Sequence, residues 1–159
     1  MEPINPKFKQ IIADLSGKTI THVAAGTENG GVVALDFGES HTIFIHCAWR
    51  LLRYDKVLST WNDAALPDEE DEDALEQDLA IKKLEGISIS TVEVGEFFDL
   101  KIMLGKAYRL DVFCDLFSHD EVSEYEENWS VSDINDNVCF VITEDFRLRE
   151  TKYNTEQPL

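Results

Sequence analysis

Histidine and cysteine are the residue types in this chain that could bind a metal, but their spacing does not favour a metal site. His41, His46 and Cys47 lie close together, and Cys114 and His119 lie in the second half of the chain. On an extended strand, His41 and His46 would point to opposite faces because they are five residues apart. The cysteine and histidine spacings typical of zinc sites do not occur in the sequence. We therefore predict no metal site and no cofactor.

The motifs of nucleophilic catalysis are also missing from the sequence. It contains neither Gly-x-Ser-x-Gly nor a glycine-rich phosphate loop followed by Lys-Ser or Lys-Thr. Ser40-His41 and Ser118-His119 are adjacent pairs, and neighbours on an extended chain point in opposite directions. Carboxylates are abundant enough for acid–base catalysis, but their positions single out no two of them. The sequence favours a non-enzymatic protein, and a small enzyme with a carboxylate-based site is the alternative.

Acidic residues are the most unusual feature of the composition. The chain has 32 acidic and 14 basic residues and a formal net charge of −18. Nine acids lie between Asp63 and Asp78 and six between Asp115 and Glu127, and neither block contains Lys or Arg. Like charges repel and stay solvated, so each block is either a solubilising segment or a docking surface for a basic partner. Nucleic acids and anionic membranes are excluded as partners because binding them needs a positive surface.

We predict that a basic protein binds these two acidic blocks through electrostatic steering. Trp61 precedes the first block and could anchor the partner, because interfaces favour a tryptophan ringed by polar groups. The acids before Ala74 have an alternative role, since a predicted helix begins there and its dipole favours negative charge at the N-terminus. The predicted partner-binding residues are Asp68, Glu69, Glu70, Asp71, Glu72, Asp73, Asp120, Glu121, Glu124, Glu126, Glu127 and Trp61.

Matched residues indicate that the chain contains the same unit twice. Residues 15–26 match 84–95 at an offset of 69, and residues 38–47 match 105–114 at an offset of 67. We predict a single domain over 1–159, with repeat units of about 6–62 and 74–148 joined by an acidic linker over 63–73.

Each predicted unit begins with a helix and continues as short strands. The two helical stripes, each followed by a glycine, are Phe8, Ile11, Ile12 and Leu15 before Gly17, and Leu75, Leu79, Ile81 and Leu84 before Gly86. Short strands joined by tight turns pair antiparallel. The predicted fold class is α+β, a single domain of two similar helix-plus-antiparallel-sheet halves that either pack sheet against sheet or share one sheet. The predicted strands span 18–25, 32–37, 42–47, 49–53 and 57–60, then 87–94, 99–104, 108–114, 129–133 and 138–143.

The cysteines and the hydropathy favour a cytoplasmic location. Cys47, Cys114 and Cys139 are few and odd in number, which is typical of a reduced protein. Strand alternation places Cys47 and Cys114 on apolar faces, where we interpret them as small buried side chains. No apolar run is long enough to span a bilayer, and the N-terminal residues lack the pattern of a signal peptide. We therefore predict a cytoplasmic protein with no membrane association.

The pattern Ile45-His-Cys-Ala-Trp-Arg-Leu51, set in this helix-plus-sheet repeat, resembles a group of small bacterial proteins. Some of these act as immunity proteins beside polymorphic or contact-dependent growth inhibition toxins. The resemblance implies binding to a toxin domain and carries over no catalytic residue. Toxins that cut nucleic acid have basic active-site clefts, which an acidic inhibitor can occlude. We expect an immunity protein for a basic toxin, most readily a nuclease, and a regulatory module with solubilising acidic segments remains an alternative.

Overall fold

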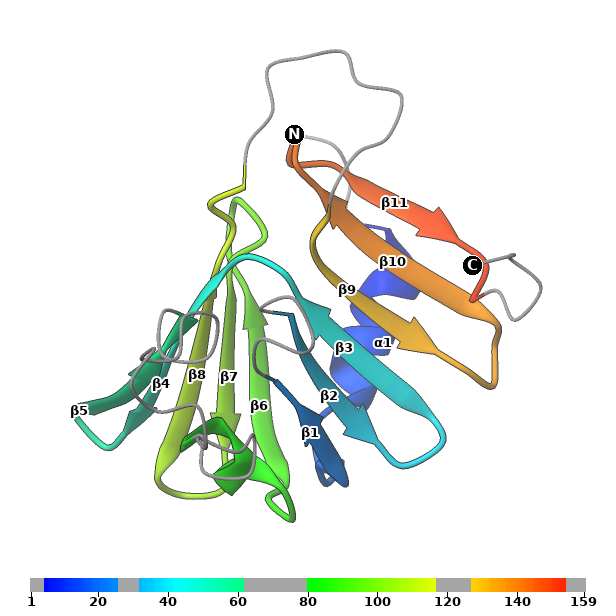
Figure 1. The fold of residues 1–159 in the computed structure, drawn as a ribbon. Helices are drawn as coiled ribbons and strands as arrows, with labels where there is room; N and C mark the ends of the chain where they lie inside the picture. Colours follow the sequence, from blue (N-terminus) through cyan, green and yellow to red (C-terminus); the bar gives the residue numbers. More distant parts are fainter. Residues whose placement is uncertain (1–4, 26–31, 62–79, 117–126, 154–159) are drawn as a thin grey trace.

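The computed structural model describes residues 5–25, 32–61, 80–116 and 127–153 (Figure 1). These segments contain one α-helix of nine residues, α1 (Pro6–Asp14), and one 3₁₀-helix of five residues, η3 (Ala80–Leu84). The other named elements in them are β-strands. The strands are β1 (His22–Ala24), β2 (Val33–Phe37), β3 (His41–Ile45), β4 (Ala48–Arg53), β5 (Lys56–Thr60), β6 (Ile89–Val94), β7 (Leu100–Leu104), β8 (Tyr108–Phe113), β9 (Glu127–Asp133), β10 (Val138–Thr143) and β11 (Leu148–Thr151).

The predicted α+β fold class is wrong, because the protein is mostly β. The described segments form two antiparallel sheets and contain one short α-helix. The first predicted helix forms because Asn5 Oδ1 accepts hydrogen bonds from the Lys7 and Phe8 N–H groups and Pro6 occupies the first turn. The second stripe is described only over 80–84, where it forms a 3₁₀-helix that buries Ile81 and Leu84. Leu75, Leu79 and the predicted linker over 63–73 lie outside the described residues.

The strands form a six-stranded sheet in the order β1-β2-β3-β9-β10-β11 and a five-stranded sheet in the order β5-β4-β8-β7-β6 (Figure 1). Each sheet therefore takes strands from both halves of the chain. This corrects both predicted arrangements, since the halves neither pack as two separate sheets nor share a single sheet. The exchange occurs where the chain leaves β3 through His46 and Cys47 and enters β4 in the other sheet. Strand β9 of the second half pairs with β3, and β8 pairs with β4.

A second junction joins the two sheets between the segments 17–20 and 86–89. Thr19 forms a bridge with Ser88, and their hydroxyl oxygens are 2.6 Å apart. The Gly17 N–H donates to Ile89 O and the Gly86 N–H donates to Ile20 O. Exchanging each residue for the one 69 positions away turns the first of these bonds into the second. The two segments that the sequence matches at this offset thus pair with each other.

The strands turn one face toward a continuous apolar core. Leu35, Ile43, Val131 and Phe140 lie opposite one another across the six-stranded sheet, and all four are buried. Helix α1 packs behind this sheet, where the Phe8 ring centroid lies 5.5 Å from that of Phe140 (Figure 1). Ile102, Leu110 and Leu51 form the equivalent inner row of the five-stranded sheet. The outward faces of the two sheets therefore hold the side chains that could form a functional site. In the described part of the chain, no helix is both long and apolar enough to cross a membrane.

Candidate functional site

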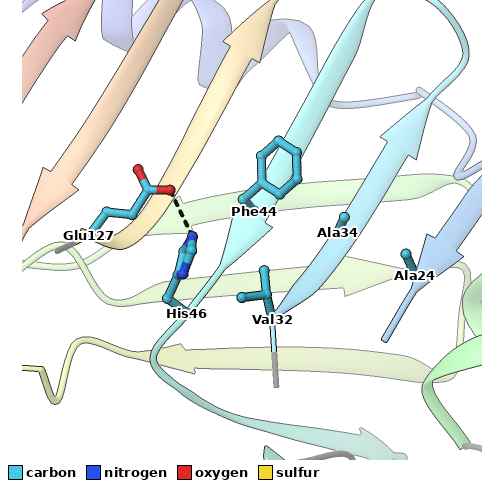
Figure 2. Close-up of a pocket in the computed structure, with 6 residues that line it drawn as sticks. All are labelled: Ala24, Val32, Ala34, Phe44, His46 and Glu127. Atoms are coloured by element: carbon cyan, nitrogen blue, oxygen red, sulfur yellow. Dashed lines mark ion pairs between the residues drawn. The ribbon is translucent and has the colours of Figure 1, made fainter. Parts of the chain in front are cut away.

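A shallow pocket lies on the outer face of the six-stranded sheet (Figure 2). Ala24, Ala34 and Phe44 stand opposite one another on β1, β2 and β3, which places their side chains on the same outward row. The two alanines are small, so space remains beside the Phe44 ring, which is 36% exposed. The pocket has a volume of about 400 Å³, and its lining residues are Ala24, Val32, Ala34, Phe44, His46 and Glu127.

The pair formed by His46 and Glu127 closes one end of this otherwise apolar pocket. His46 Nε2 lies 2.7 Å from Glu127 Oε1, and Figure 2 shows the two side chains pointing toward each other. The side chains are 32% and 28% exposed, so solvent and a partner can reach both. A carboxylate has two oxygens and accepts several hydrogen bonds. Glu127 can therefore keep His46 as a partner while it binds a cationic group.

The backbone beside the pocket is fixed by Asn128, which is fully buried. The His46 and Cys47 N–H groups both donate to Asn128 O, at 2.9 and 3.1 Å. The Asn128 side-chain oxygen accepts from the Leu116 N–H, and its amide nitrogen donates to Leu116 O and Thr143 O. These bonds hold the start of β9 against the passage from β3 to β4. They thereby set the positions of His46 and Glu127, which flank this junction.

Two of the predicted partner-binding residues lie in the described part of the chain, and they fall in different places. Glu127 lines the pocket on the six-stranded sheet. Trp61 directly follows β5 of the five-stranded sheet and packs, half-buried, against the core. The role of Trp61 as an anchor for a partner stays a prediction. The other predicted residues, Asp68, Glu69, Glu70, Asp71, Glu72, Asp73, Asp120, Glu121, Glu124 and Glu126, lie outside the described residues.

The apolar part of the pocket was not predicted from the sequence. Its signal was nevertheless present in the strand alternation. Strand β3 alternates so that Ile43 and Ile45 face the core, which sends Phe44 outward where a polar residue is usual. The same alternation sends Ala34 outward on β2. An apolar residue on an outward row is therefore the departure from the usual alternation that could have pointed to the pocket.

The outer face of the five-stranded sheet has a different character. Arg109 Nε lies 3.1 Å from Asp111 Oδ1, and Arg50 Nη2 lies 3.5 Å from Asp111 Oδ2. Asp111 is buried between these two guanidinium groups, with 6% of its surface exposed. The Arg50 guanidinium also lies over the Phe113 ring, 5.1 Å from its centroid. Asp111 therefore forms ion pairs with both arginines, although Arg50 Nε, Arg109 Nε and Asp111 Oδ1 are buried without a hydrogen-bond partner.

Metal ligation and similarity to known proteins add no further evidence on the site. Within residues 5–25, 32–61, 80–116 and 127–153, no group of three or more His, Cys, Asp and Glu side chains could hold a metal ion. Comparisons of the chain with protein-family models, with curated proteins and with solved structures found no match.

Proposed function

We propose that this chain is a non-enzymatic binding domain for a basic protein and acts as an immunity protein that blocks the active-site cleft of a nuclease toxin. The observation that carries the proposal is the position of Glu127. This residue is the last acid of the second acidic block in the sequence, and it also lines the pocket. The second acidic block and the apolar pocket therefore meet at Glu127.

The distribution of charge supports a basic partner. The described residues contain all 14 basic residues of the chain and 16 of its 32 acids, so they are close to neutral. The other 16 acids stand in segments without any basic residue, and the largest of these segments directly follow Trp61 or directly precede Glu127. Concentrated negative charge raises the association rate with a positively charged protein and gives that rate a strong dependence on salt.

The pocket itself fits a long basic side chain. The methylene groups of an arginine or lysine can pack on Phe44 and Val32 while the cationic head reaches the carboxylate of Glu127. A guanidinium group binds a carboxylate through two parallel hydrogen bonds, so arginine is the better fit of the two. The acidic blocks would then steer the toxin, and the pocket would retain it.

Binding kinetics test the proposal. The probes are catalytically inactivated nuclease domains of bacterial growth-inhibition toxins, measured by stopped-flow mixing at several salt concentrations. We expect that reversing four charges within 68–73 slows association and flattens its salt dependence, because steering is lost. The control is Glu96→Gln, an exposed acid between β6 and β7 of the other sheet. An association rate that is unchanged by the charge reversal, or a panel in which no domain binds, would contradict the proposal.

A small enzyme is the second candidate, and the His46–Glu127 pair is the observation that favours it. A carboxylate that orients an imidazole is the arrangement of many general bases. The other lining residues are alanine, valine and phenylalanine, so an enzyme built here would act through an activated water or a substrate group. A thermal-shift screen with metabolites separates the candidates. A strong shift that His46→Gln abolishes would favour the enzyme over the binding domain.

A further inference from the structure

Cys47 and Cys114 lie opposite each other where the chain passes between the sheets. Strands β4 and β8 pair without a register shift from Arg53–Tyr108 to Ala48–Phe113, so the next pair outward is Cys47 and Cys114. At the other end of the same register, the Tyr54 N–H donates to Ala107 O at 2.8 Å. Hydrogen-bonded pairs alternate along an antiparallel ladder, so this bond makes the even-numbered positions of β4 the bonded ones. Cys47 and Cys114 therefore form a non-hydrogen-bonded pair.

The bonds made by the two backbones agree with this assignment. The Cys47 N–H donates to Asn128 O, and the Cys114 N–H donates to a side-chain oxygen of Asp99. Neither of these groups bonds to the opposite cysteine. In non-hydrogen-bonded pairs the Cα atoms are about 4.5 Å apart and the side chains approach closely. That separation lies within the range of about 4.4–6.8 Å that a disulfide bond accepts.

The side chains of Cys47 and Cys114 agree with the pairing of their backbones. A hydrogen bond between the Cys47 and Cys114 side chains is the largest cause of the raised pKa of the Cys47 thiol, so the two thiols lie within reach of each other. Cys47 is buried, whereas Cys114 is half-buried and its Sγ donates to Phe98 O at 3.4 Å. Both cysteines are free thiols. The more exposed Cys114 is thus the sulfur that a reagent reaches first.

We propose that Cys47 and Cys114 are a reversible dithiol–disulfide site that links β4 to β8 when it is oxidised. The oxidant is a small disulfide such as oxidised glutathione. The Cys114 thiolate attacks one sulfur of that disulfide, which breaks its S–S bond and releases one glutathione thiolate. Cys47 then loses its proton and attacks the Cys114 sulfur, which releases the second glutathione. The two cysteines are oxidised by two electrons, the glutathione disulfide is reduced, and the two protons end on the released thiols.

Oxidation at this place would act on both the fold and the pocket. The new bond would close a long loop between the two halves of the chain, which stabilises the folded state chiefly by restricting the unfolded one. It would also fix the residue next to His46, whose N–H shares the Asn128 carbonyl with that of Cys47. The hydrogen bond to Cys114 and burial raise the pKa of the Cys47 thiol, so the second step should become faster as the pH rises.

The test uses the folded full-length chain with Cys139→Ser, which leaves Cys47 and Cys114 as its two thiols. After incubation with oxidised glutathione and an acid quench, we expect a mass loss of two hydrogen atoms and a peptide in which Cys47 is linked to Cys114. The oxidised chain should unfold at a higher urea concentration, and a reductant should reverse the shift. Controls that also carry Cys47→Ser or Cys114→Ser should show no shift.

Two results would overturn the proposal. One is a folded chain that keeps both thiols while the same chain, unfolded in urea, forms the disulfide. The other is the accumulation of glutathione adducts without a link between the cysteines. If Cys139→Ser prevents folding, peptide mapping of the oxidised natural chain without reductant gives the same answer, because a bond from Cys139 to either cysteine would contradict the proposed pair.

Discussion

One row of outward side chains crosses each sheet, and the two rows can be compared position by position. In the six-stranded sheet the row is Ala24, Ala34, Phe44, Ser130, Val141 and, on the edge strand β11, Arg149. In the five-stranded sheet it is Glu93, Lys101, Asp111, Arg50 and Thr60. Phe44 and Asp111 hold equivalent places, 67 residues apart, in the two central strands. Their inward neighbours are apolar in both sheets, so the difference is confined to the outer surface.

The same strand pattern therefore gives an outer surface with exposed apolar side chains on one sheet and a surface of paired charges on the other. Asp111 is 6% exposed and has two arginines beside it, so its charge is compensated within the chain. Phe44 is 36% exposed beside two alanines, so its apolar surface remains uncovered in the free protein. A protein that buried this exposed apolar surface next to a carboxylate would gain binding free energy.

The largest expected effect comes from Asn128, which holds the junction on which both surfaces depend. Asn128→Ala removes three side-chain hydrogen bonds and leaves the Leu116 N–H and O and the Thr143 O without these partners. Buried groups that lose hydrogen bonds cost about 1–3 kcal/mol each, so we expect the free energy of unfolding to fall by about 3 kcal/mol. Urea denaturation measures the change.

The matched control is Asn135→Ala, because Asn135 is exposed in the turn between β9 and β10. We expect this variant to stay within about 0.5 kcal/mol of the natural chain. Equal stability of the two variants would show that the junction does not depend on the Asn128 side chain.

The second prediction removes the charge compensation of the five-stranded sheet. Asp111→Ala leaves the guanidinium groups of Arg50 and Arg109 without their shared carboxylate. Removing one member of a fully buried pair costs about 3–5 kcal/mol, but these arginine side chains are 42% and 34% exposed and solvent compensates part of the loss. We therefore expect a loss of about 2 kcal/mol, measured by urea denaturation.

Glu93→Ala, at the exposed end of the same row, is the control, and we expect it to change the stability by less than about 0.5 kcal/mol. If both variants are as stable as the natural chain, the row of charges does not stabilise the five-stranded sheet. The two rows would then differ in exposed surface but not in their effect on stability.

Much of the strand pattern could be predicted from the sequence, because alternation is a local property. The ten predicted strands each overlap a strand of the structure. The missed strand, β11, reads Leu148-Arg-Glu-Thr151 and is an exposed edge strand, so it has no alternation to detect. Pairing was not predictable in the same way. Alternation tells which face a residue occupies, but it does not tell which strand lies beside it, and the exchange of strands between halves depends on contacts distant in sequence.

The candidate site was harder to predict than the strands for a related reason. The acidic blocks stand out in the composition, and they led to Glu127 but not to the pocket beside it. His46, Phe44 and Ala24 come from separate segments, and the pairing of three strands brings them together. The second predicted helix is described only over 80–84, where it is a 3₁₀-helix instead of an α-helix. Gly86, which was predicted to end it, has a φ of +86°, a conformation that favours glycine.

The third prediction compares two outward residues that are equally exposed on the two sheets. Phe44 and Met103 are each 36% exposed. Replacing either with alanine should lower the free energy of unfolding by about 1 kcal/mol or less, because little buried surface is lost. If the pocket retains a basic partner, Phe44→Ala should raise its dissociation rate about tenfold and Met103→Ala should not. Stopped-flow dissociation measures both, and equal rates for the two variants would place the binding surface elsewhere.

The smallest expected effect concerns pH and again separates the sheets. His41 on β3 is 5% exposed, and the equivalent residue of the five-stranded sheet is Tyr108. Burial lowers the pKa of His41 below its usual value, although the Asp133 carboxylate, 3.6 Å from Nε2, acts in the opposite direction. As the pH falls below the usual histidine pKa, His41 becomes protonated in the unfolded chain but not yet in the folded chain. The free energy of unfolding therefore decreases until the pH reaches the lower pKa of His41 in the folded chain.

His41→Gln removes the titrating group, so the difference in urea midpoint between about pH 8 and about pH 5 should become smaller than in the natural chain. Tyr108→Phe tests the matching position, and it should leave this difference unchanged because the substitution leaves His41 in place. If the His41→Gln variant loses as much stability on acidification as the natural chain, the pH dependence arises from the carboxylates instead. The six-stranded sheet would then be no more sensitive to acid than its counterpart.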